Sequence, residues 1–341
     1  MTATVLDEST LEERLTTPSE RDIAAALQLD GDVLLLGAGG KIGPSLAARM
    51  SRAIRSAGLK HKVIAVVRKA RAGAFGRPSG TVRVVEADLL DPEAIDSLPD
   101  APNVVYMVGR KFGSTGDLPL TWATNVWIAG LAAQRFRHSR IVAFSTGNVY
   151  PFVSVDGRGA NEDTVVAPVG EYAQSTLARE RLFEYFSNIH QTPVLLFRLN
   201  YAIDLRYGVL LDICEKVISG EPIDLTTGFV NVIWQGDANS YCFRSLPLCD
   251  SPARVLNVTG LKPLSVREVA LRFGHHFGKK PNFVGTEAAS ALLSDATRCV
   301  DLLGEPEIGE DQLIEMTADW VSAGGVTLGT PTKFERRDGS F

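Results

Sequence analysis

The sequence predicts an α/β fold in which a doubly wound parallel sheet of the Rossmann type is followed by a smaller C-terminal substrate-binding region. Two observations support this. A glycine-rich turn follows a short apolar run near the start of the chain, and further apolar runs alternate with helical patterns up to residue 200. Such alternation is typical of parallel sheets, because each crossover helix covers one face of the sheet. After residue 200 the alternation becomes irregular.

The chain is organised around its glycine turn, in the segment DVLLLGAGGKIG at 32–43. Residues 33–36 are uniformly apolar, as in a strand buried on both faces, and residues 44–55 have helical periodicity. Glycines at such a junction let the backbone turn tightly and approach a pyrophosphate, which the free N–H groups of the helix then bind. A turn that binds nothing is the alternative. The residues expected to contact a dinucleotide here are Gly37, Gly39, Gly40, Lys41, Ile42 and Gly43.

Composition and charge limit the function. Of the 341 residues, 45% are hydrophobic and 22% charged, as in an ordinary globular protein. The net charge of −5 argues against nucleic acid or an anionic membrane as a partner, since both attract cationic surfaces. No apolar run approaches the roughly 20 residues of a transmembrane helix, and the acidic N-terminus does not resemble a signal peptide. Scattered cysteines indicate reduced thiols of a cytoplasmic protein, and the histidines lack metal-ligand spacing, so no metal site is expected.

Four regions are expected along the chain. Residues 1–30 form an N-terminal extension, in which a loose polar lead precedes a short helix that starts at a capping box over 17–20. Residues 31–200 form the dinucleotide-binding domain, 201–322 most of the substrate-binding region, and 323–341 an extended tail that wraps the body or a partner subunit. The later strands are expected at 62–67, 81–86, 103–108, 140–144 and 193–197. The later helices are expected at 119–136, 171–187, 265–277 and 310–321.

The end of the second strand bears on the choice between NAD and NADP. Dinucleotide folds for NAD place an acid there to bind the ribose hydroxyls, whereas those for NADP place a cation near the 2′-phosphate. The sequence has Arg68-Lys69-Ala70-Arg71 and no acid, so NADP is favoured over NAD. A solvated basic loop is the alternative. Asp88 is expected to bind the adenine amine, and Leu89, Val108 and Gly109 are expected beside the coenzyme.

Taken in order, the motifs resemble those of the extended short-chain dehydrogenases/reductases, the NAD(P)-dependent sugar epimerase/dehydratase group. The resemblance covers roughly residues 31–322, and no single motif decides it. Its landmarks are the 37–43 turn, Asp88-Leu89, Asn125, residues 144–150, Tyr172, residues 198–200, 220–222, 231–237, 256–260 and 293–295.

The resemblance implies a catalytic site in which the chain departs from the family pattern at one position. The family uses a Ser/Thr, a Tyr and a Lys four residues after the Tyr. Thr146 and Tyr172 match the first two, but Thr176 stands in place of the Lys and is expected to bind only the ribose. Lys111 is the better candidate for the missing cation, because its strand end borders the nicotinamide in this fold. Arg179 lies about 10 Å from Tyr172 along the helix axis, too far for a simple replacement.

The function that the resemblance implies is hydride transfer by an NAD(P)-dependent oxidoreductase or epimerase acting on a sugar, a sugar acid or a nucleotide sugar. The alternative is a catalytically weak or inactive NAD(P)-binding sensor, which the missing Lys favours. The small-molecule substrate is expected to contact Arg110, Asn148, Asn200 and Tyr201. Asn125 is expected to hold backbone in place or to act in catalysis. A homodimer is expected through the 119–136 and 171–187 helices.

Overall fold

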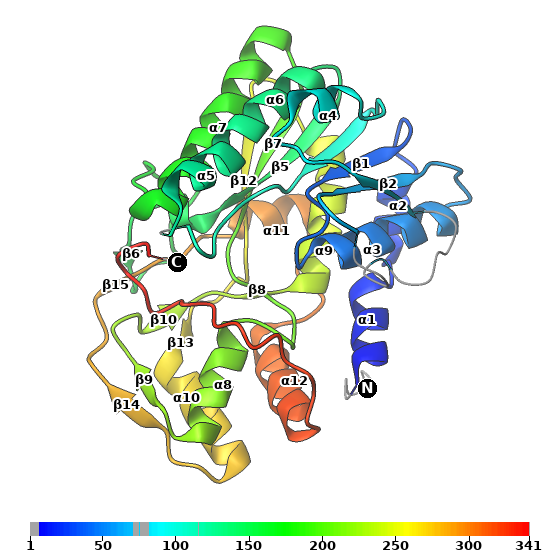
Figure 1. Ribbon diagram of the computed structural model, residues 1–341. Coiled ribbons are helices and arrows are strands. Elements are labelled where there is room, and N and C mark those ends of the chain that lie inside the picture. Colours follow the sequence, from blue (N-terminus) through cyan, green and yellow to red (C-terminus); the bar gives the residue numbers. More distant parts are fainter. Residues whose placement is uncertain (1–6, 71–74, 76–81, 115, 341) are drawn as a thin grey trace.

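A seven-stranded parallel sheet forms the centre of the computed structural model, which describes residues 7–70, 75, 82–114 and 116–340 (Figure 1). The strand order β12-β7-β5-β4-β1-β2-β3 grows outward from β1 in both directions. In such sheets ligands bind beyond the carboxyl ends of the strands, where the order reverses. The predicted fold class is confirmed. The strands are β1 (Val33–Leu36), β2 (Val63–Val67), β3 (Val82–Glu86), β4 (Asn103–Tyr106), β5 (Arg140–Thr146), β7 (Val194–Leu199) and β12 (Arg254–Val258).

Helices cover both faces of the sheet. Alternate side chains of β1 point to opposite faces, so Val33 and Leu35 join one apolar core while Leu34 and Leu36 join another. The first core includes residues of α3 (Gly43–Ser56), α9 (Gln235–Arg244) and α11 (Thr297–Leu303). The second includes residues of α4 (Pro92–Asp96), α6 (Ile128–Arg135) and α7 (Gly170–His190). Burial on both faces explains why β1 is an uninterrupted apolar run.

The C-terminal half builds a second lobe with its own core. Helices α8 (Val209–Ser219), α10 (Val266–Phe277) and α12 (Glu310–Ser322) pack together below the sheet in Figure 1, and α1 (Glu8–Thr16) adds Leu11 and Leu15 to the same core. Short strand pairs complete the lobe and its junction with the sheet. They are β9 (Pro222–Asp224) with β14 (Asn282–Val284), β10 (Phe229–Val230) with β13 (Leu264–Ser265), β8 (Ala202–Ile203) with β11 (Ile233–Trp234), and β6 (Val153–Ser154) with β15 (Ser290–Ala291).

Several elements differ from the sequence prediction. The predicted loose lead contains α1, and α2 (Glu20–Ala26) begins at a capping box of Ser19 and Asp22, not of Thr17 and Glu20. The predicted 119–136 helix is divided into α5 (Leu118–Trp122), a π-helical turn η1 (Ala123–Trp127) and α6. The seventh strand, β12, was not predicted, and it comes from the region expected to bind substrate.

The C-terminal tail crosses the second lobe and returns to the sheet domain. In Figure 1 it runs in red from α12 to the neighbourhood of β6 and β15. Leu328 donates a backbone hydrogen bond to Arg206, and the Arg337 guanidinium donates to Ser290. Gly339 lies against Gly170, the first residue of α7. The tail therefore wraps the body of its own chain, one of the two predicted possibilities.

None of the helices in the described parts of the chain is long and apolar enough to cross a membrane. The four cysteines carry free thiols, and all but Cys249 are buried.

Candidate functional site

The glycine turn places backbone, not side chains, at the floor of a cavity. Gly37 has φ +82°, and a Cβ there would lie 2.9 Å from the backbone of Val108. A Cβ on Gly43 would lie 2.1 Å from the carbonyl oxygen of Ala38, so only glycine lets α3 begin this close to β1. At Gly39 and Gly40 a Cβ would meet only ordinary contacts, at 3.5 Å or more. Protein packing therefore requires Gly37 and Gly43, while Gly39 and Gly40 leave room for a ligand.

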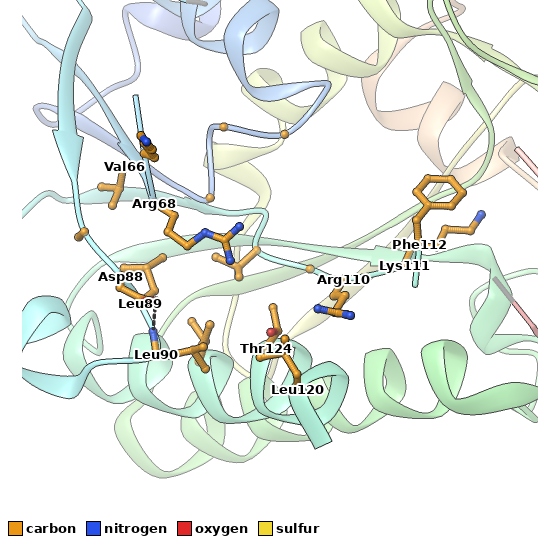
Figure 2. Close-up of a pocket in the computed structure, with 18 of the residues that line it drawn as sticks. Val66, Arg68, Asp88, Leu89, Leu90, Arg110, Lys111, Phe112, Leu120 and Thr124 are labelled. Atoms are coloured by element: carbon orange, nitrogen blue, oxygen red, sulfur yellow. Dashed lines mark hydrogen bonds between the residues drawn. The ribbon is translucent and has the colours of Figure 1, made fainter. Parts of the chain in front are cut away.

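The larger cavity, of about 840 Å³, lies above this floor at the carboxyl ends of β1, β2 and β4. Figure 2 shows Arg68 and Asp88 towards one end of it and Lys111 with Phe112 towards the other. Helix α3 begins at this floor without a side-chain cap, so N–H groups of its first turn remain available to an anion. The predicted cofactor residues that line the cavity are Gly37, Gly39, Gly40, Arg68, Asp88, Leu89, Val108 and Gly109.

Basic side chains line this cavity just after the end of β2. Arg68 and Lys69 line it just after β2, and Arg71 lies outside the described residues. Asp88 also lines it, and one of its carboxylate oxygens accepts a hydrogen bond of 3.1 Å from the Leu90 backbone N–H. Glu86, at the end of β3, accepts one of 3.0 Å from the Ala70 backbone. The cavity wall just after β2 is therefore basic.

A second, smaller cavity of about 230 Å³ contains the predicted catalytic pair. Tyr172 reaches it from the first turn of α7 and Thr146 from the end of β5. Lys111 lines both cavities. Of the residues predicted to contact the substrate, Asn148, Asn200 and Tyr201 line the smaller cavity.

The polar side chains of this cavity are held in place by hydrogen bonds. Thr146 Oγ1 accepts from the Asn148 backbone N–H and donates to the Asn148 side-chain oxygen, both at 3.2 Å. Asn200 donates its amide to Asn231 at 3.1 Å, and Asn231 is anchored in turn to the Ser294 carbonyl at 2.6 Å. Tyr201 has φ +41°, an unusual backbone conformation for a residue other than glycine.

Two lysines project among the tyrosines of the smaller cavity. Lys111 Nζ lies 5.8 Å from the ring centroid of Tyr172 and 6.0 Å from that of Tyr201. Lys41 Nζ lies 3.3 Å from the ring centroid of Tyr207. Burial lowers the pKa of Lys111 to about 8, because the charged ammonium loses water there. Burial likewise lowers the pKa of Lys41 to about 7, although the nearby carboxylate of Asp204 acts in the opposite direction.

Five of the predicted site residues lie elsewhere than expected. Lys41 and Ile42 line the smaller cavity and not the larger one, because the later side chains of the turn point towards the smaller cavity. Gly43 packs against Ala38. Thr176 is fully buried, lines neither cavity and donates its hydroxyl to the Tyr172 carbonyl at 2.8 Å, which corrects the expected ribose contact. Arg110 lines the larger cavity, away from the expected substrate residues.

Among the polar residues of the smaller cavity, sequence reasoning missed Tyr207 and Thr332 and judged Arg179 too distant. Arg179 reaches it although it lies two turns beyond Tyr172, because its long side chain runs back beneath the helix. Its guanidinium donates to the Phe144 carbonyl at 3.0 Å and to the Asn125 side-chain oxygen at 3.0 Å. Thr332 comes from the tail and bonds to Asp212 of α8, so its position depends on tertiary contacts that no local sequence pattern contains.

Asn125 lies in the π-helical turn and holds backbone in place. Its side-chain oxygen accepts from the Arg110 N–H at 2.7 Å, and its amide donates to the Arg110 carbonyl at 3.2 Å and to Ser175 at 2.9 Å. It therefore fixes the strand end that carries Lys111 against the helix that carries Tyr172. These hydrogen bonds match the first of the two roles expected for Asn125, which is to hold backbone in place.

Two further findings complete the site. A buried ion pair of Arg198 and Glu180 lies behind it, and Glu180 also accepts a hydrogen bond from Ser145. Among the residues that the structure describes, no group of three His, Cys, Asp or Glu side chains has an arrangement that could hold a metal ion.

Fold and site together define a Rossmann-type protein with a short-chain dehydrogenase arrangement of Tyr and Thr beside the glycine turn. The sequence profile of the NAD dependent epimerase/dehydratase family matches residues 33–203, half of the chain, and the chain belongs to this family. The resemblance inferred from the motifs is confirmed. A search of the curated proteins found no sequence match.

Solved structures with the same fold include three whose ligands or activities are named. MoeE5 in complex with UDP-glucuronic acid and NAD is 21% identical, with a TM-score of 0.69 over 86% of this chain and 100% of that one. dTDP-glucose 4,6-dehydratase from Bacillus anthracis in complex with NAD is 18% identical, with a TM-score of 0.70 over 86% and 96%. UDP-glucose 4-epimerase from Thermotoga maritima is 17% identical, with a TM-score of 0.69 over 86% and 99%. At these identities the likeness shows the fold.

Proposed function

We propose that the chain is an NAD(P)-dependent oxidoreductase or epimerase that acts on a sugar or sugar derivative. One observation carries the proposal. Tyr172 and Thr146 line a small cavity that adjoins the cavity above the glycine turn, and Lys111 lines both. A carbinol carbon in the smaller cavity would thus lie beside a coenzyme in the larger one. The nucleotide-sugar ligands and activities of the similar structures support a sugar as the substrate.

Each residue has a role that its position supports. The bound coenzyme supplies the acceptor for the substrate hydride. Tyr172 takes the proton of the carbinol hydroxyl, and Thr146 donates a hydrogen bond to the same oxygen, having turned from Asn148. Lys111 Nζ lies 5.8 Å from the centroid of the Tyr172 ring, where its positive charge would stabilise the tyrosinate that accepts this proton and so becomes the neutral phenol. It thereby takes over part of the role of the lysine that Thr176 replaces.

NADP is our proposed coenzyme. Arg68 and Lys69 line the adenosine end of the larger cavity, where a 2′-phosphate would need positive charge, and no acid follows β2. The family as a whole is described as NAD dependent, and NAD is bound in two of the similar structures reported above. Direct comparison of NAD⁺ and NADP⁺ affinities decides between them. Replacement of Arg68 by Ala should weaken NADP⁺ binding more than NAD⁺ binding.

A catalytically weak or inactive NAD(P)-binding sensor is the second candidate. The feature that favours it is Thr176, whose hydroxyl is engaged with the Tyr172 carbonyl and supplies no charge. Lys111 and the hydrogen-bonded Thr146 favour the enzyme. Cytoplasmic location and a homodimer remain part of the proposal. The dimer would form through the outer surface of α5, η1 and α7, which exposes several large apolar side chains.

The test measures coenzyme binding and turnover separately. NAD⁺ and NADP⁺ are titrated by calorimetry, and sugars, sugar acids and nucleotide sugars are then incubated with the protein and the coenzyme that binds. Net reduction is followed by nicotinamide absorbance and epimerisation by NMR, because an epimerase returns the hydride. Failure to bind either coenzyme refutes both candidates. Binding without turnover of any substrate class refutes the enzyme and leaves the sensor.

Replacing Tyr172 with Phe distinguishes the roles further. The enzyme proposal predicts at least a 100-fold loss of turnover with unchanged coenzyme affinity, since general acid–base catalysis contributes about 10²–10⁴-fold. Tyr185→Phe is the matched control, because Tyr185 lies on the exposed side of the same helix and lines neither cavity. Equal activity of the two variants would contradict the role given to Tyr172.

A further inference from the structure

Charged side chains are spread along the larger cavity. Among the described residues that line it, they are Arg68, Lys69, Asp88, Arg110 and Lys111. In Figure 2, Arg110 lies between the end marked by Arg68 and the end marked by Lys111. A dinucleotide that spans these two ends has its pyrophosphate near the middle, because that group joins its two nucleosides. Arg110 is therefore the cation whose position matches a pyrophosphate.

The strand pairing places Arg110 beside the glycine turn. β1 and β4 are neighbours in the sheet, so the segments that follow them lie next to each other. A Cβ on Gly37, the first glycine of the turn, would lie 2.9 Å from the Val108 backbone. Arg110 comes two residues after Val108 and lines the same cavity as the turn. The cavity therefore offers an anion two sets of donors, the backbone N–H groups of the turn and a guanidinium.

Hydrogen bonds hold Arg110 in place at both its backbone and its side chain. Asn125 accepts from the Arg110 N–H at 2.7 Å and donates to the Arg110 carbonyl at 3.2 Å. One terminal nitrogen of the guanidinium donates to the Gly113 carbonyl at 3.1 Å, so the side chain is held against its own loop. A ligand that binds a group already held in place loses less conformational entropy, and the arrangement therefore favours binding.

The Arg110 guanidinium has few acceptors within the protein. Among the described residues its Nε is buried without a hydrogen-bond partner, its side chain bonds only to the Gly113 carbonyl, and it forms no ion pair. A guanidinium carries five N–H donors and a permanent positive charge. A buried donor without an acceptor costs free energy, which a ligand oxygen would recover. Phosphate oxygens suit this planar group, because they can accept two of its N–H bonds at once.

We propose that Arg110 binds the pyrophosphate of the coenzyme, together with the N–H groups of the glycine turn. The inference deepens the proposed function and rests on it for the identity of the coenzyme. A substrate contact is not favoured, because Arg110 lines only the larger cavity, whereas Tyr172 and Thr146 line the smaller one. A 2′-phosphate is not favoured either, because Arg68 and Lys69 follow β2, where that phosphate is bound in NADP folds. This role differs from the substrate contact expected for Arg110 from the sequence.

The experiment titrates the full-length protein by calorimetry with ADP, ADP-ribose, NAD⁺, NADP⁺ and 2′-AMP. ADP ends at the pyrophosphate, whereas 2′-AMP carries its single phosphate on the ribose. Arg110→Met removes the charge and the donors but keeps a long side chain. We expect this variant to bind ADP, ADP-ribose, NAD⁺ and NADP⁺ at least about tenfold more weakly, because charge-assisted hydrogen bonds are strong. Its affinity for 2′-AMP should stay within about twofold of the wild-type value, because that ligand has no pyrophosphate.

A conservative variant and a matched control complete the test. Arg110→Lys keeps the charge but not the planar set of donors, so its affinity for ADP should lie between those of the wild type and Arg110→Met. Arg55→Met should bind all five ligands like the wild type, because Arg55 is exposed in the last turn of α3 and lines neither cavity. Thermal melts establish that the variants are folded.

The inference is overturned if Arg110→Met binds ADP and NAD⁺ like the Arg55→Met control. It is also overturned if the variant loses affinity for NAD⁺ but not for ADP, since the contact then lies beyond the pyrophosphate. An equal loss for 2′-AMP and ADP would overturn it too, because it would indicate a distorted cavity or a 2′-phosphate contact. A wild type that binds the coenzyme through Arg110 but converts no sugar would refute the enzyme and leave this inference intact. A wild type that binds none of the five ligands would refute both.

Discussion

At the scale of single residues, Gly37 can be tested for both conformation and space. An alanine there must adopt φ +82° and place its Cβ 2.9 Å from the Val108 backbone. Gly58→Ala is the matched control, since Gly58 has φ +72° with nothing within 4 Å of its Cβ position. We expect Gly58→Ala to lower the free energy of unfolding by about 1 kcal/mol and Gly37→Ala by about 2 kcal/mol more, with loss of coenzyme affinity. Equal losses of unfolding free energy in the two variants, measured by urea denaturation, would contradict the steric clash expected at Gly37.

The buried Arg198–Glu180 pair is a second residue-scale test. Glu180 accepts two hydrogen bonds from the Arg198 guanidinium, at 2.8 and 2.6 Å, and both side chains are almost fully buried. Glu180→Gln leaves the guanidinium charge without a counter-ion, so we expect a loss of about 3–5 kcal/mol in the free energy of unfolding. Asp250→Asn breaks the exposed Arg254–Asp250 pair and should cost less than about 1 kcal/mol. Similar losses in the two variants would contradict this account.

At the scale of elements, the C-terminal tail is tied to α8 by Thr332. Burial raises the pKa of Asp212 from 3.8 to about 6, and hydrogen bonds from Thr332 act against that rise. Because the folded pKa is raised, ionisation of Asp212 costs stability as pH rises from about 4 through 6. Thr332→Val removes the hydrogen bond from the Thr332 hydroxyl to Asp212, so the stability lost on ionisation of Asp212 should become larger and the loss should extend to higher pH. Thr330→Val, on an exposed residue of the tail, should keep the wild-type dependence. Unfolding measured from pH 5 to 8 tests both.

Elements with strong local signals could be predicted from the sequence, and those set by distant contacts could not. The apolar run before Gly37 and the capping residue Ser265 lie within the elements they define, so β1 and α10 were predicted closely. The π-helical turn is associated with the hydrogen bonds of Asn125 to Arg110 and Ser175, which are distant in sequence. Strand β12 exists because Leu256 and its neighbours pair with β7. No local pattern contains that information.

At the scale of the whole molecule, the candidate site was likewise predicted in part, and the rest of it depends on contacts between distant parts of the chain. Tyr172, Thr146 and Lys111 were predicted to share a site from the resemblance to the short-chain dehydrogenase family, and they line one cavity. The direction of the Lys41 side chain and the entry of Thr332 depend on how the second lobe and the tail meet the sheet domain. Lys41, which the sequence pattern assigned to the coenzyme, therefore adds its charge to the smaller cavity.

Assembly is the remaining prediction at this scale. Trp127 on η1 and Tyr185 and Ile189 on α7 are each more than half exposed, although they are large apolar side chains. A second copy of the chain that packed on this surface would remove them from water, and two-fold symmetry is the commonest arrangement. We expect light scattering to give twice the monomer mass of 36.8 kDa. Trp127→Glu combined with Ile189→Glu should give the monomer, because burying two carboxylates in an apolar interface is costly. Leu271→Glu, on the exposed surface of α10, should leave the dimer intact. A monomeric wild-type protein would contradict the prediction directly.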